Sequence, residues 1–107
     1  MLNLYHATIA SLALTVSGMA MSATDCGPYK VKHIQVEGAH VLFHPDVSGY
    51  SWKTLGVLDV PGTKERLSLL LTAHASRKTV TLRFSDDNYP CADYDLSKPA
   101  YMVRINS

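Results

Sequence analysis

The chain's two cysteines, Cys26 and Cys91, follow an apolar N-terminal segment that is typical of a secretion signal. Residues 12–21, LALTVSGMAM, have roughly the length of a signal-peptide core and are shorter than the about 20 residues of a membrane-spanning helix. Small residues suited to cleavage follow, although no Lys or Arg precedes the apolar core. We therefore expect residues 1–23 to be a signal peptide, residues 24–107 to be one domain, and the protein to be secreted or periplasmic.

A disulfide between Cys26 and Cys91 is expected to stabilise this small domain. About 85 residues remain after the leader, which is enough for only one modest core. Exported proteins fold where thiols are oxidised, and a bridge closing a loop of about 65 residues contributes about 4 kcal/mol in the chain-entropy model. Two free buried thiols are the alternative.

Charge and hydropathy argue against two classes of partner. The chain has 10 Lys and Arg against 9 Asp and Glu, all beyond the leader, for a net charge of +1. A protein that binds duplex nucleic acid normally carries a basic stripe, and the sequence contains none. We expect no nucleic-acid partner and no membrane span.

The C-terminal half has the clearest periodicity. Within residues 64–78, apolar side chains recur at helical spacing, which predicts one buried helix face: Leu67, Leu70, Leu71, His74 and Ala75. Residues 79–84 alternate as a half-buried strand, residues 85–99 are rich in Asp, Pro and Ser and predict a long loop, and residues 101–105 alternate again.

Three extended runs precede the helix. Residues 32–36 and 39–44 flank a turn at Glu37 and Gly38, which favours a hairpin, and a third run covers residues 52–60. Three strands, a helix and two strands is the element order of an OB-fold. We therefore expect a mainly β (α+β) domain that forms a five-stranded Greek-key barrel with one helix between strands 3 and 4.

A family resemblance agrees with this order. Residues 66–84 (RLSLLLTAHASRKTVTLRF), Cys91 in the following loop, the closing run YMVRI and an early Cys resemble the pentameric B subunits of bacterial AB toxins, particularly the subtilase-cytotoxin and pertussis-like group. The resemblance implies a homo-pentamer with helices lining a pore, a toxin A subunit as partner and a cell-surface glycan as ligand. The group's sialic-acid contacts would fall around Gly27 and Pro28, so that glycan site is not carried over, and Arg77 stands where a glycine often ends the helix.

Aromatic side chains next to polar ones are the candidate ligand contacts, because sugar rings pack on aromatic faces and OB-fold loops bind oligosaccharides. Two such clusters occur, one before the third strand and one in the long loop: Tyr50, Ser51 and Trp52; Tyr89, Asp93 and Tyr94. For Trp52, a position in the core of the small barrel is the favoured interpretation. The long loop is equally a purely structural connection.

Catalysis, cofactors and metal ions have little support in the sequence. No Ser lies in a nucleophile elbow, and no Cys is left to act as a nucleophile. His33 lies near His40 and His44 in the predicted hairpin, but His40 and His44 are four residues apart on one strand, about 13 Å, too far to share a zinc ion, so these side chains are interpreted as surface histidines. We expect a non-catalytic binding module, either toxin B-subunit-like or a monomeric secreted interaction or inhibitor protein, with no enzyme activity, cofactor or metal site.

Overall fold

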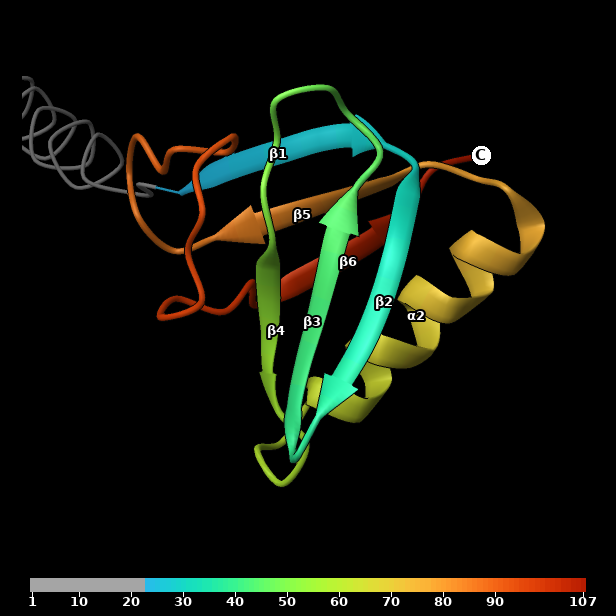
Figure 1. Cartoon of the computed structure of the whole chain (residues 1–107), viewed down its shortest axis with the longest axis vertical. Coiled ribbons are helices and arrows are strands. Elements are labelled where there is room, and N and C mark those ends of the chain that lie inside the picture. The colour runs from blue at the N-terminus through green and yellow to red at the C-terminus, as the bar shows by residue number, and fades with distance from the viewer. Residues whose placement is uncertain (1–22) are drawn as a thin grey trace, which may run out of the picture.

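The computed structural model describes residues 23–107 as two small antiparallel sheets and one helix (Figure 1). The predicted signal peptide, residues 1–23, lies outside the described residues apart from Ala23. In chain order the elements are β1 (Thr24–Tyr29), β2 (Val31–Glu37), β3 (His40–Pro45), β4 (Lys53–Val57), α2 (Thr63–Ser76), β5 (Val80–Phe84) and β6 (Met102–Ile105).

The two sheets are joined through their first strands. One sheet has the order β1-β5-β6 and the other β2-β3-β4, and only Lys30 separates β1 from β2. At Gly27 the backbone φ is 116°, and a Cβ there would lie 2.7 Å from the carbonyl oxygen of Val80. Glycine is therefore required where β1 passes the Val80 carbonyl of β5.

The expected mainly β architecture with one helix is confirmed, but the five-stranded barrel is wrong. The residues described form six strands in two sheets of three. The missed strand, β1, has the sequence TDCGPY, whose Gly and Pro hide any alternation of apolar and polar residues. It is a strand because it pairs with β5, some 55 residues later in the chain, with Thr24 opposite Phe84, for example. Local sequence patterns do not reveal such distant pairing.

Helix α2 packs against β6, β2 and β4 with a face slightly different from the predicted one. Leu70 and Ala73 are buried and Leu67 is partly buried, but of the residues predicted to be buried Leu71 is 48% exposed, and His74 and Ala75 are exposed as well. The helix begins one residue before the predicted range, at Thr63, with Gly62 in a left-handed conformation as its N-cap. Because the sheets cover only one side, half of this short helix faces outward.

The core lies between the two sheets and α2. Its largest fully buried apolar side chains come from both sheets and the helix: Phe43, Phe84, Leu55, Leu70 and Leu82. The predicted disulfide is present, with the Cα atoms of Cys26 and Cys91 5.6 Å apart and Cys26 inside the core. No helix of residues 23–107 is long and apolar enough to cross a membrane.

The free energy of unfolding is expected to depend on pH through Tyr29. Its side chain is buried and its hydroxyl has no hydrogen-bond partner among the described residues. Burial, followed by the nearby Tyr50, raises the pKa of Tyr29 above its ordinary value of 10.0. The folded protein therefore keeps this proton at pH values where the unfolded chain loses it. Titration of Tyr29 leaves the free energy of unfolding unchanged below about pH 10 and lowers it as the pH rises further.

We predict that Tyr29→Phe raises the free energy of unfolding by about 1 kcal/mol at neutral pH, because it removes an unsatisfied buried hydroxyl. It also reduces the loss of stability above about pH 10. Urea unfolding at several pH values measures both effects. Tyr101→Phe, on an exposed side chain, is the control and shifts stability by less than about 0.5 kcal/mol. Equal alkaline losses in wild type and Tyr29→Phe would contradict the assignment.

Candidate binding site

The structure brings the two predicted aromatic clusters together. The backbone N–H of Ser51 donates to the carbonyl oxygen of Ala92 at 3.1 Å, and the N–H of Asp95 donates to that of Trp52 at 3.4 Å. Residues 50–52 and 92–95 therefore lie side by side, although about 40 residues separate them in the sequence.

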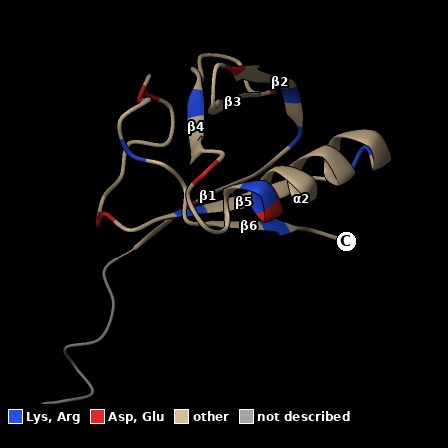
Figure 2. Ribbon diagram, turned by 90° about the horizontal axis from the view of Figure 1, so that it is seen from below, with Lys and Arg blue, Asp and Glu red and all other residues tan. Residues whose placement is uncertain are grey.

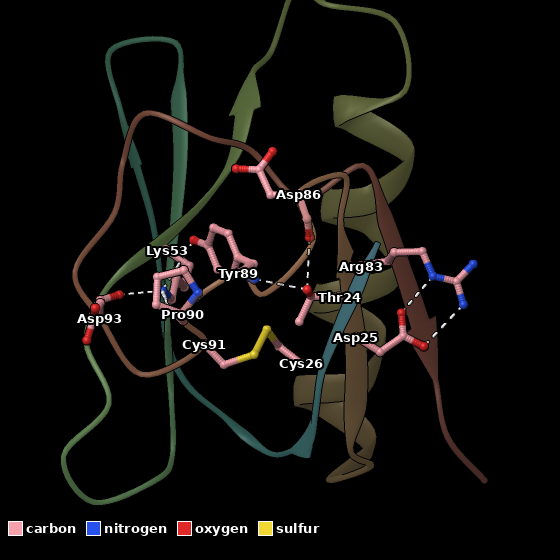
Figure 3. The surroundings of a disulfide bond; sticks show 10 residues. All are labelled: Thr24, Asp25, Cys26, Lys53, Arg83, Asp86, Tyr89, Pro90, Cys91 and Asp93. Atoms are coloured by element: carbon pink, nitrogen blue, oxygen red, sulfur yellow. Dashed lines mark hydrogen bonds and ion pairs between the residues drawn. A yellow bond between two sulfur atoms is a disulfide. The ribbon is translucent and has the colours of Figure 1, made fainter. Parts of the chain in front are cut away.

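The long loop, residues 85–101, is anchored at its start by β1 (Figure 3). The Thr24 hydroxyl donates to the carbonyl oxygen of Asp86 at 2.8 Å and accepts from the N–H of Tyr89 at 3.0 Å. Two residues further, Cys91 is bonded to Cys26 of the same strand. Near the loop's end, the N–H of Ala100 donates to the carbonyl oxygen of Thr54 on β4 at 3.1 Å. The loop is therefore tied to both sheets.

Lys53, the first residue of β4, anchors the loop from inside the protein. Its side chain is fully buried, and its Nζ donates to the Tyr89 hydroxyl at 3.3 Å, to the Pro90 carbonyl at 3.1 Å and to the Asp93 carbonyl. The ammonium group also lies 4.7 Å from the centre of the Tyr89 ring, within the range of a cation–π contact. Burial lowers the pKa of Lys53, and the charges of Asp95 and Asp93 oppose that shift.

The three loop residues predicted as ligand contacts have different positions. Tyr89 is 5% exposed and stacks on Phe84 with ring centres 3.8 Å apart, so its ring supports the loop from within. Burial raises the pKa of its hydroxyl. Asp93 is exposed at the surface, although its carbonyl accepts from Lys53. Tyr94 is 65% exposed and offers an accessible aromatic ring.

Trp52 lies outside the core and forms an aromatic patch with His33 and His44. Its ring is stacked with that of His33 at a centroid distance of 6.1 Å and meets the His44 ring edge-on at 5.3 Å. Trp52 and His44 are partly exposed and His33 is exposed. Because successive side chains of a strand alternate, this patch lies on the face opposite Lys53 and Phe43, which point into the core.

A polar hollow of about 360 Å³ adjoins the patch at His44. Tyr50 forms part of its wall and meets the Tyr29 ring edge-on at 6.2 Å. Lys32, Asp46 and Ser48 also line it, so the hollow offers a cation, a carboxylate and a hydroxyl. Its volume lies within the range of small-ligand sites, about 300 to 1,000 Å³.

Of the residues that matter in this region, Lys53 was not predicted from the sequence, and His33 and His44 were interpreted as surface histidines with no shared role. The histidine pair follows from the hairpin: a tight turn at Gly38 places Glu37 opposite His40, and counting back along both strands places His33 opposite His44. Lys53 gives no such signal, because a lone lysine beside an apolar run is usually exposed.

Charged side chains do not gather into a stripe. Figure 2 shows Lys and Arg on strands of both sheets and at both ends of α2, interspersed with Asp and Glu. Within residues 23–107 no group of three or more His, Cys, Asp or Glu side chains is arranged to hold a metal ion. Comparison with known protein families, with curated proteins and with solved structures yields no match to this chain.

We predict that Lys53→Met lowers the free energy of unfolding by about 2 kcal/mol, because it removes the donor to the buried Tyr89 hydroxyl and to the partly buried carbonyls of Pro90 and Asp93. Methionine nearly preserves the side-chain volume, so the change removes the ammonium group, with its hydrogen bonds and its contact with the Tyr89 ring, without leaving a large cavity. Lys64→Met, on the exposed surface of α2, is the matched control and changes stability by less than about 0.5 kcal/mol. Urea unfolding measures both variants. If Lys53→Met proves as stable as wild type, the ammonium group does not anchor the loop.

Proposed function

We propose that this protein is a secreted, non-catalytic binding module that recognises a cell-surface glycan through the aromatic patch and the adjoining polar hollow. The observation that carries the proposal is the partly exposed Trp52, immediately before β4 and next to a hollow lined by polar side chains. Sugar rings combine apolar C–H faces, which pack on aromatic rings, with hydroxyls that need hydrogen-bond partners. Lys32, Asp46 and Ser48 supply both donors and acceptors.

The strand pairing supports an OB-type arrangement as the basis of this function. In this interpretation β1 and β2 are the two halves of one bent first strand, which pairs with β5 in one sheet and with β3 in the other. The helix follows β4, and the hydrogen bond from Ala100 to Thr54 links the sheets on the opposite side. OB-folds bind oligosaccharides with the face formed by their second and third strands and with the loops beside it.

Export is supported by the disulfide. Stable disulfides are typical of proteins that fold in the periplasm or outside the cell. The predicted leader would supply the route, and cell-surface glycans are accessible only to a protein that is exported.

Assembly into a ring of the toxin B-subunit kind is supported by the outward side of α2. Leu69 and Leu71 are 40% and 48% exposed on opposite flanks of the buried Leu70, so a neighbouring copy could contact the helix on either side. A homo-pentamer would bury these side chains and repeat the glycan site, which strengthens binding to a surface through multivalency. A toxin A subunit would then be the natural partner of the ring.

We predict that the purified, disulfide-bonded protein binds on a glycan array and that Trp52→Ala lowers this binding at least about tenfold, which corresponds to the loss of one aromatic contact. Tyr101→Ala, on an exposed ring near the start of β6, is the matched control and retains binding. Native mass spectrometry of the same samples reports assembly: five copies support the ring. A monomer that binds no glycan favours instead a monomeric interaction or inhibitor protein.

A further inference from the structure

His33 and His44 face each other across the hairpin of β2 and β3. They are direct partners in the antiparallel pairing, and their ring centres are 6.1 Å apart. Side chains of directly opposed residues start from Cβ atoms about 4.5 to 5.5 Å apart, so both rings reach the same point above the sheet. His40, which the sequence pattern groups with His44, is instead opposite Glu37 at the far end of the hairpin.

The distance between the two rings suits a shared metal ion. Each metal–nitrogen bond is about 2 Å long, and the ring centre lies about 1 Å beyond the nitrogen, so two imidazoles on one ion have centres about 5 to 6 Å apart. The observed 6.1 Å therefore requires only a small rotation of one side chain. His33 is exposed, which leaves its ring free to make that rotation.

The hydrogen bond of His44 prepares its ring for metal binding. Its Nδ1 lies 2.8 Å from the carbonyl oxygen of Pro45. Since a carbonyl only accepts, Nδ1 carries the proton and Nε2 carries the free lone pair. Metal-binding histidines usually donate their second ring N–H to a carbonyl or a carboxylate in this way, which fixes the tautomer and the orientation of the ring.

We propose that His33 and His44 together bind one divalent transition-metal ion, with Cu²⁺ bound more tightly than Zn²⁺ or Ni²⁺, as the affinity order of such ions for nitrogen ligands requires. The protein supplies two ligands, and water completes the coordination. The site is an open surface site, because the described residues supply no third His, Cys, Asp or Glu to the group. This inference goes beyond glycan recognition and does not depend on it.

Trp52 makes the site directly observable. It is the only tryptophan of the chain, and its ring centre is 5.3 Å from that of His44 and 6.1 Å from that of His33. A Cu²⁺ ion held by the two histidines lies next to the indole and quenches its fluorescence. The test needs no label and no glycan, so its outcome is independent of the glycan array.

The experiment is a titration of the purified, disulfide-bonded protein with Cu²⁺, followed by Trp52 fluorescence, and a calorimetric titration with Zn²⁺. We expect saturable quenching at one ion per chain that a chelator reverses. His33→Ala and His44→Ala each weaken binding at least about tenfold, the double variant loses the saturable phase, and His40→Ala, on the same hairpin, binds as wild type.

Two results would overturn the proposal. One is quenching that rises without saturation, and the other is an unchanged affinity in the double variant, which would assign the ion to another part of the chain such as its amino terminus. Far-UV circular dichroism confirms that the variants are folded. Because neither histidine is buried, the fold is expected to tolerate both substitutions.

Discussion

The covalent bond between Cys26 and Cys91 determines how the irregular loop lies on the two sheets. Residues 85–101 contain no strand or helix, and a free loop of this composition would sample many conformations. The disulfide fixes its middle to β1, and Lys53 donates hydrogen bonds to the carbonyls on either side of that point. The disulfide to β1 and the buried ammonium group of Lys53 on β4 together restrict the loop to one conformation.

Two neighbouring residues connect this support to the proposed binding surface. Lys53 points into the core and holds the loop, while Trp52 points outward and forms the aromatic patch. The backbone carbonyl of Trp52 also accepts from the N–H of Asp95 in the loop. The backbone of Trp52 is thus held in place on both sides, and a preorganised residue loses little conformational entropy when a ligand binds.

Sequence patterns predicted the elements that depend on local periodicity and missed those that depend on distant partners. The helix, five of the strands and the disulfide follow from spacing and export, whereas β1 exists only through its pairing with β5. Trp52, for which a core position was the favoured prediction, is instead partly exposed outside the core, and of the two loop tyrosines Tyr94 is exposed while Tyr89 stacks inside on Phe84. The exposure of Leu71 could not be predicted either, because how far the sheets cover α2 depends on their packing and not on the helical repeat.

The most direct measurement is amide hydrogen exchange of the native protein and of Cys26→Ser/Cys91→Ser. We predict that the N–H groups of Tyr89, Asp95 and Ala100 are protected in the native protein. Removing the disulfide lowers their protection at least about tenfold more than that of the central strand β3. Loop amides that exchange in the native protein as in an unstructured chain, or whose protection survives loss of the disulfide, would contradict this prediction.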